Sequence, residues 1–223
     1  MVNINQNTVS AENQMINSSE ISFLGDPNAP VKILILGNSI TRHAPKAEIG
    51  WLGDWGMAAS TAESDYVHRL YDMLTKAGNR VYMRVRQASY WEIHFLEGDV
   101  LSYFKDERDF KADLVIFRLG ENVPKDAKPK FQSNLVKLIE YICPQFGKML
   151  FTTCFWKNPI VDDAIFAVAK QRGDLCVDLL SNDESMMALG KFEHKGVSMH
   201  PSDLGMEMIA NRIFAQMYTI MNF

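Results

Sequence analysis

Five strand-length segments, most of them apolar, recur along the chain, and segments with helical spacing of apolar residues separate them. The strand-length segments lie at 31–36, 80–87, 114–119, 149–155 and 175–179, and the helical segments at 63–76, 131–142, 161–171 and 203–220. Runs that are apolar at almost every position are typical of strands buried on both faces. Strands that alternate with helices form a parallel sheet covered by helices on both sides. The sequence therefore predicts a three-layer α/β/α sandwich around a central, mostly parallel five-stranded sheet.

One domain accounts for most of the 223 residues. Residues 1–21 are rich in Asn, Gln, Ser and Glu and predict a polar, poorly ordered N-terminal arm, whereas residues 22–223 predict a single domain. Hydrophobic residues make up 47% of the chain and charged residues 22%, as in ordinary globular proteins. The net charge of −4, without a long basic run, argues against nucleic acid or an anionic membrane surface as a partner.

Cysteine usage and hydropathy bear on the compartment. Each of the three cysteines lies in an apolar stretch outside any CxxC pair, which predicts reduced, buried, structural thiols at Cys143, Cys154 and Cys176. No stretch approaches the ~20 apolar residues that span a bilayer, so we expect no membrane span. The first residues lack the basic start and apolar middle of a signal peptide. We expect a cytoplasmic location if the chain is complete, and a periplasmic or secreted one if a signal peptide has been removed.

Polar residues follow the first and third predicted strands, and a histidine precedes the last predicted helix. Ser39 lies in the turn at 37–41, where we expect a helix to start, Asn122 follows the third strand, and His200 lies in a loop. The carboxyl ends of parallel strands share one rim, so we expect these side chains to meet there. Alone, Ser39 equally fits a helix cap, but a base at His200 and an oxyanion donor at Asn122 favour a serine hydrolase. The chain has no GxxxxGK[ST] or GxGxxG, which disfavours nucleotide binding.

The order of these segments resembles the SGNH, or GDSL-type, hydrolase superfamily. Gly-Asn-Ser ending at Ser39, Gly-Glu-Asn ending at Asn122 and a His-Pro pair at His200 match its blocks in order, over residues 31–220. The segment 50–60 also resembles a block of one bacterial branch of that superfamily. The resemblance implies a flavodoxin-like three-layer fold, an acyl-serine intermediate, and neither a metal nor a cofactor. It assigns the nucleophile to Ser39, the general base to His200 and an oxyanion donor to Asn122.

Two positions near the rim depart from the superfamily's pattern. Asn38 replaces the usual Asp of Gly-Asp-Ser, a mild change because Asn also hydrogen-bonds the local backbone. The stretch 86–92 lacks the Gly whose N–H group joins the oxyanion hole. We match the backbone N–H of Trp91 to it, because an acidic residue follows, as often in the superfamily. Ser89 and Tyr90 are the alternatives.

The superfamily's acid stands three residues before the histidine, and here that position is Val197. No carboxylate can orient His200 from there. The orienting group is then a backbone carbonyl, which gives a Ser–His dyad, or a substitute acid among Glu193, Asp203 and Asp178. We expect one of these rather than loss of activity, because a base needs only to be held in place.

The loop after the nucleophile turn is rich in aromatic residues. Trp51 and Trp55 are candidates for a substrate wall whose indole faces stack on a sugar, although a packed loop fits the same pattern. His43 is expected at the surface. His194 and His200 have no Cys or Asp at ligand spacing, so no metal site is predicted.

These residues predict a serine esterase that hydrolyses carboxylic esters through an acyl-serine intermediate. The expected substrate is a short acyl group on a polar or carbohydrate carrier. The alternatives are an acyltransferase that uses the same site and a non-catalytic carbohydrate-binding domain. The sequence leaves the oligomeric state open.

Overall fold

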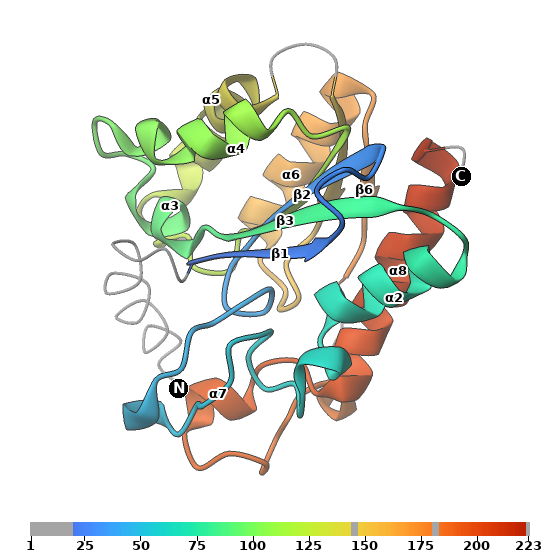
Figure 1. Cartoon of the computed structure of the whole chain (residues 1–223). Coiled ribbons are helices and arrows are strands. Elements are labelled where there is room, and N and C mark those ends of the chain that lie inside the picture. Colours follow the sequence, from blue (N-terminus) through green and yellow to red (C-terminus); the bar gives the residue numbers. More distant parts are fainter. Residues whose placement is uncertain (1–19, 144–146, 180–182, 222–223) are drawn as a thin grey trace.

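A six-stranded sheet forms the centre of the described structure (Figure 1). The computed structural model describes residues 20–143, 147–179 and 183–221. The strands are β1 (Ile21–Gly25), β2 (Val31–Gly37), β3 (Val81–Gln87), β4 (Leu114–Arg118), β5 (Lys148–Thr152) and β6 (Leu175–Val177). Their order across the sheet is β1-β3-β2-β4-β5-β6, with β1 antiparallel to β3 and the other neighbours parallel. The five parallel strands thus have the flavodoxin-like order.

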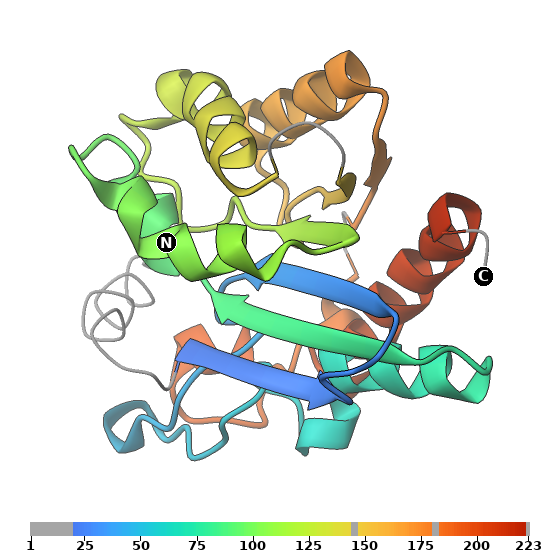
Figure 2. The same ribbon diagram turned by 45° about the horizontal axis from the view of Figure 1, so that its top comes forward.

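Helices cover both faces of the sheet (Figure 2). They are α2 (Tyr66–Lys76), α3 (Ser89–His94), α4 (Lys105–Phe110), α5 (Phe131–Ile142), α6 (Pro159–Arg172), α7 (Lys195–Ser198) and α8 (Asp203–Met221). Short 3₁₀ turns lie at Ala47–Ile49, Ala62–Ser64, Val100–Phe104, Lys128–Lys130 and Glu184–Met186. Among the helices of the described ranges, none is long and apolar enough to cross a bilayer.

Successive side chains of a buried strand point to opposite faces, and β2 supplies both cores. Ile33 and Ile35 pack with the apolar residues of α2 and α8. Leu34 and Leu36 pack on the other face, with those of α3, α5 and α6. Each fully buried side chain of this size contributes about 1.5–3 kcal/mol. The predicted three-layer α/β/α class with a mostly parallel sheet is therefore confirmed.

The sheet has six strands in the described residues rather than the five predicted. The additional strand, β1, lies at the edge and pairs antiparallel with β3, with Phe23 opposite Arg84. The Phe23 ring stacks on Tyr82 at a centroid distance of 5.4 Å. These partners come from a distant part of the chain, so the five residues of β1 carry little local signal. The predicted arm lies outside the described residues up to position 19, while Glu20 and Ile21 belong to the described fold.

Helix ends follow the local chemistry of the sequence. The Asp65 side chain caps α2 by accepting from the His68 N–H at 2.8 Å. Helix α6 begins with Pro159 and ends at Gly173, whose φ of 75° is left-handed. The short helices α3, α4 and α7 were not predicted, because four to six residues are too few to establish a helical period.

Candidate active site

Ser39 lies in the first turn after β2, on the rim formed by the carboxyl ends of the strands. At Gly37 a Cβ atom would lie only 1.7 Å from the Thr41 hydroxyl oxygen, so this turn requires glycine. The N–H groups of Thr41 and Arg42 donate to the Asn38 carbonyl at 2.9 and 3.0 Å. These bonds close a single helical turn around the nucleophile.

The helix expected after Ser39 does not form, which corrects the sequence prediction. Pro45 has no N–H group and disfavours the helical conformation at Ala44. The chain instead runs as a loop that returns to the turn, where the Met57 N–H donates to the Ser39 carbonyl at 2.9 Å. This hydrogen bond holds the loop between Ser39 and α2 next to Ser39.

Ser39 and His200 form a hydrogen-bonded pair, although 161 positions separate them. The distance between Ser39 Oγ and His200 Nε2 is 2.8 Å. His200 precedes α8 and is completely buried, while Ser39 is 7% exposed. The Trp156 ring packs edge-on against the imidazole at a centroid distance of 5.4 Å. The contact between nucleophile and base that serine hydrolysis requires is present.

A backbone carbonyl orients the histidine. His200 Nδ1 lies 2.7 Å from the carbonyl oxygen of Gly196 in α7. A carbonyl only accepts, so Nδ1 carries the proton of the neutral ring, and Nε2 is left to accept the Ser39 proton. Burial lowers the pKa of His200 to about 3, so the ring is neutral at pH 7.

The side chains considered as substitutes for the missing acid have other surroundings. Val197 is fully buried in an apolar cluster. The carboxylate of Asp203 accepts from the N–H and hydroxyl of Ser60 at 2.8 and 2.7 Å, and that of Asp178 accepts from a threonine hydroxyl. Glu193 is exposed. Of the alternatives left open by the sequence, the backbone carbonyl is the group in contact with the base.

Asn122 lies just past β4, and a buried carboxylate holds its amide. Asn122 Nδ2 donates to Glu92 Oε2 at 2.6 Å, and the Gly120 N–H donates to Glu92 Oε1 at 2.5 Å. Gly120 has a φ of 143°, and a Cβ atom there would lie 2.7 Å from Cys154 Sγ. Glycine is therefore required where the chain leaves β4 for the rim.

Amide and charged groups next to the nucleophile form a buried network. Asn38 Nδ2 donates to Glu92 at 3.1 Å and to Glu121 at 2.6 Å. The fully buried Arg118 donates to Glu121 at 2.9 Å and to Asn38 Oδ1 at 2.5 Å. Burial, together with the charge of Glu121, raises the pKa of Glu92 to about 7. Asn suits position 38, because an Asp there would add a third carboxylate to Glu92 and Glu121 in a network with the single guanidinium of Arg118.

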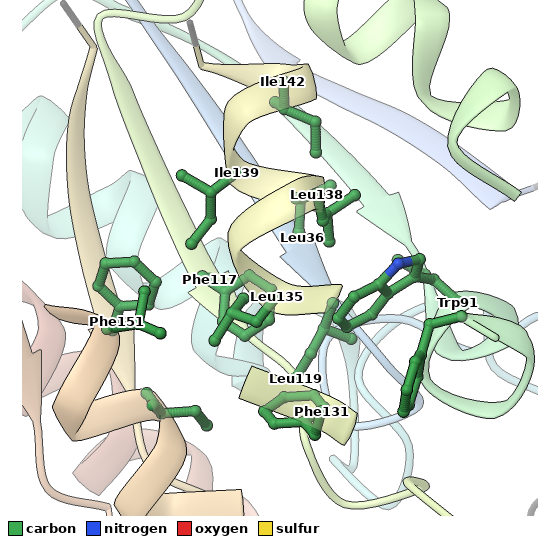
Figure 3. Packing of buried hydrophobic residues seen from close by; sticks show 14 of the residues in the cluster. Leu36, Trp91, Phe117, Leu119, Phe131, Leu135, Leu138, Ile139, Ile142 and Phe151 are labelled. Carbon is green, nitrogen blue, oxygen red and sulfur yellow. The ribbon is translucent and has the colours of Figure 1, made fainter. Parts of the chain in front are cut away.

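Trp91 points into the core among large apolar side chains (Figure 3). Its ring lies 5.8 Å from that of Phe131, and the residue is 1% exposed. Its N–H donates to the Ala88 carbonyl at 3.0 Å, in the first turn of α3. The prediction that this N–H completes the oxyanion hole is therefore wrong, because α3 begins at Ser89 and uses the group internally.

The aromatic loop is packed rather than open at Trp51. This residue is 2% exposed, and its Nε1 donates to the His43 carbonyl at 2.9 Å, which corrects its assignment to a substrate wall. Trp55 is half-buried and lies edge-on to Trp51, so its role toward a substrate stays a prediction. His43 is 1% exposed instead of lying at the surface, and burial lowers its pKa to about 4.

The sequence prediction did not include Glu92, the buried carboxylate that contacts Asn122. Its only signal was its place as the acidic residue of the stretch 86–92, where it served to align Trp91. Arg118, at the end of the third predicted strand, was expected close to the rim and lies there, whereas Glu121 gave no signal apart from its place beside Asn122. In the described residues, no three His, Cys, Asp or Glu side chains gather as a metal site would require.

Comparisons by sequence and by structure give different results. No protein-family model and no curated protein matches this chain by sequence. An esterase from Pseudoalteromonas sp. matches with a TM-score of 0.58 at 14% identity, over 86% of this chain and 99% of that one. A lipase/acylhydrolase from Enterococcus faecalis matches at 0.61 and 16%, over 85% and 96% of the two chains. A family two carbohydrate esterase from Clostridium thermocellum, in complex with cellohexaose, matches at 0.59 and 16%, over 89% and 67%.

The chain has the SGNH hydrolase fold. The resemblance drawn from three short sequence blocks is thus confirmed at the level of the fold, over most of the chain. Identities of 14 to 16% establish the SGNH fold and not the reaction, so the reaction rests on the geometry of the site.

Proposed function

We propose that this chain is a serine esterase that hydrolyses carboxylic esters through an acyl-serine intermediate. The observation that carries the proposal is the 2.8 Å contact between Ser39 Oγ and His200 Nε2. The Gly196 carbonyl supports it by fixing the tautomer in which Nε2 accepts. A serine that merely caps a helix has no need of an oriented base.

The reaction follows from these positions. Ser39 Oγ attacks the acyl carbon while its proton passes to His200 Nε2. Nε2 then returns this proton to the alcohol oxygen as the C–O bond breaks, which leaves the acyl group on Ser39. Water attacks the acyl-serine, gives its proton to Nε2, and the Ser39 oxygen leaves with a proton as the carboxylic acid is released. The dipole of the Gly196 carbonyl stabilises the protonated ring in both steps.

The oxyanion requires donors aimed at the position where negative charge develops. We assign this role to the backbone N–H of Ser39 and to the Asn122 side chain. Asn122 Nδ2 carries two hydrogens, of which one binds Glu92 and the other is assigned to the oxyanion. Loss of one such donor typically lowers kcat by ~10²–10³-fold.

We assign the substrate to short acyl groups on a polar or carbohydrate carrier. Ser39 is only 7% exposed, so little of the residue faces solvent where the acyl group must approach. Trp156 is half-buried against the base, so the exposed part of its ring can line the site beside a polar carrier. The carbohydrate esterase that shares the fold supports this class, because it was solved with cellohexaose.

Nitrophenyl esters from acetate to octanoate test the proposal. We expect the highest kcat/KM on acetate, with the rate falling as the acyl chain lengthens. Ser39→Ala should reduce hydrolysis to background, and His200→Ala should lower kcat by ~10²–10⁴-fold, the usual contribution of a general base. Hydrolysis that survives in Ser39→Ala would contradict the mechanism, and equal rates on all esters would contradict the substrate class.

Two buried or paired residues provide matched controls. Ser202 is 4% exposed and its hydroxyl donates to the Ser185 carbonyl, so Ser202→Ala should keep both activity and labelling by a fluorophosphonate probe. His68 binds Asp65 at the start of α2, so His68→Ala should keep wild-type kcat. Of the variants Ser39→Ala, Ser202→Ala and His68→Ala, only Ser39→Ala should lose labelling by the fluorophosphonate probe.

A further inference from the structure

One carboxylate contacts both the turn after β2 and the segment after β4. Glu92 lies in α3 and is 0% exposed. Its Oε1 accepts from Asn38 Nδ2 at 3.1 Å, from the Gly120 N–H at 2.5 Å and from the Asn122 N–H at 3.4 Å. Its Oε2 accepts from Asn122 Nδ2 at 2.6 Å. Glu92 therefore bridges the residue before the nucleophile and the proposed oxyanion donor, which follow the separate strands β2 and β4.

We propose that Glu92 is a positioning residue of the oxyanion hole, which fixes both the place and the rotation of the Asn122 amide relative to Ser39. The inference rests on the proposed function, in which Asn122 donates to the oxyanion. It adds to that function a residue that touches neither the substrate nor the reacting atoms.

The rotation of the amide is the first thing that Glu92 determines. An Asn side chain can turn by 180° and exchange its oxygen with its NH₂ group. An ionised carboxylate only accepts, so it faces the NH₂ group and would repel Oδ1. With Nδ2 held at 2.6 Å from Glu92 Oε2, one hydrogen of Asn122 is used and the second has a fixed direction. A flipped amide would present an acceptor to the oxyanion.

The charges around Glu92 explain how a buried carboxylate is tolerated there. The charged groups that face it are Arg118 in β4 and Glu121 just past that strand. Arg118 binds Glu121 directly at 2.9 Å and reaches Glu92 only through Asn38. Glu92 is thus satisfied by amide and backbone donors, as a buried charge must be. These donors belong to the rim residues Asn38, Gly120 and Asn122, so the ionisation of Glu92 and the geometry of the rim depend on each other.

A double-mutant cycle on nitrophenyl acetate hydrolysis tests the inference. Glu92→Gln keeps the shape of the side chain. However, it places an NH₂ group, which is itself a donor, against the donors from which Glu92 accepts. We expect Glu92→Gln to lower kcat by ~10²–10³-fold with KM changed less than about twofold, as for loss of an oxyanion donor. Asn122→Ala should cause a similar loss. In the double variant the loss should not exceed that of Asn122→Ala by more than about threefold, because both changes remove the same interaction.

Glu107 supplies the matched control. It is also a buried glutamate, 1% exposed, but it lies in α4 and binds Arg84 at 2.8 Å. Glu107→Gln should leave kcat unchanged. If Glu92→Gln does not fold, as judged by circular dichroism, the same cycle is run with Glu92→Asp, which keeps the carboxylate and shortens its reach.

The outcomes distinguish a failure of the inference about Glu92 from a failure of the proposed function. Losses that multiply in the double variant would overturn the inference, because Glu92 would then act independently of Asn122. A kcat of Glu92→Gln within about twofold of wild type would overturn it as well. Activity that does not depend on Ser39 would instead overturn the proposed function. Activity that depends on Ser39, together with losses in kcat that add in free energy in the double variant, would overturn the role of Glu92 and leave the proposed function standing.

Discussion

Two buried ionisable side chains set the charge state of the site, and their pKa values are displaced in opposite directions. Burial lowers the pKa of His200 to about 3, which keeps the base neutral. Burial and the Glu121 charge raise the pKa of Glu92 to about 7, so this carboxylate takes up a proton in the neutral range. Above pH 7 the base is neutral and Glu92 is ionised, which is the combination that the proposed mechanism needs.

The pH profile of kcat therefore should report Glu92 rather than the catalytic histidine. We expect kcat to rise with pH through one proton step near pH 7 and then to level off. Below the step Glu92 is protonated. Its O–H donor then faces the NH₂ donor of Asn122, which displaces the Asn122 amide from its position. His200 adds no step in this range, because its pKa of about 3 lies below it. The measurement is kcat for nitrophenyl acetate from about pH 5 to pH 9.

Glu92→Gln should remove that step, because an amide does not titrate. Glu20→Gln is the control, since burial also raises the pKa of Glu20 to about 7 while its carboxylate pairs with Arg86. It should keep the step. A step near pH 7 that persists in Glu92→Gln would assign the titration to another group.

Among the elements, the short helix α7 contacts the base directly. The helix is four residues long, and the His194 side chain caps it by accepting from the Val197 N–H. It presents the Gly196 carbonyl to His200 and buries the Val197 side chain among Trp51 and its neighbours. The carbonyl and the side chain of adjacent residues point in different directions, so this helix cannot offer a carboxylate from position 197.

Val197→Asp should therefore fail to create a Ser–His–Asp triad. We expect no gain in kcat and a loss of about 3–5 kcal/mol in the free energy of unfolding, because the new carboxylate is buried without a partner. Urea denaturation and nitrophenyl acetate kinetics measure the two effects. Val197→Asn has the same shape without the charge and should lose less stability. A Val197→Asp variant that is as stable as wild type and faster would contradict this description of α7.

At the scale of the whole molecule, the doubly wound topology brings distant segments to one rim. It buries Cys143 and Cys154, whereas Cys176, predicted to be buried, is only partly so. The three cysteines are free, and they lie on β6, at the end of α5 and just past β5. Burial raises the pKa of each thiol, to about 12 for Cys176. The thiolate is the reactive form, so the folded chain should protect all three.

A thiol titration checks this protection. In the native protein we expect reaction with an aromatic disulfide reagent only over the time of unfolding, and in urea we expect rapid reaction of all three thiols. A reducing agent should change neither the melting temperature nor kcat. Rapid reaction of one native thiol would show that a cysteine is accessible and activated, contrary to its burial.

The sequence by itself determined the elements with strong local patterns and the order of the catalytic segments. Apolar runs buried on both faces and helices with a clear period are recognisable within a few residues. The rule that parallel strands end at one rim then placed Ser39 and Asn122 together. The three-layer fold therefore followed from the sequence, and so did the pairing of Ser39 with a histidine near the C-terminus.

Only the tertiary structure decided how the site is held. The edge strand β1, the orientation of His200 by the Gly196 carbonyl, and the burial of Trp91 depend on partners that no local pattern names. Asn38 and Glu92 meet across 54 positions, and Asn38 and Glu121 across 83. Buried hydrogen bonds require accuracy of a few tenths of an ångström, which only the packed core supplies. For this reason an unpredicted carboxylate, that of Glu92, lies against the amide of Asn122.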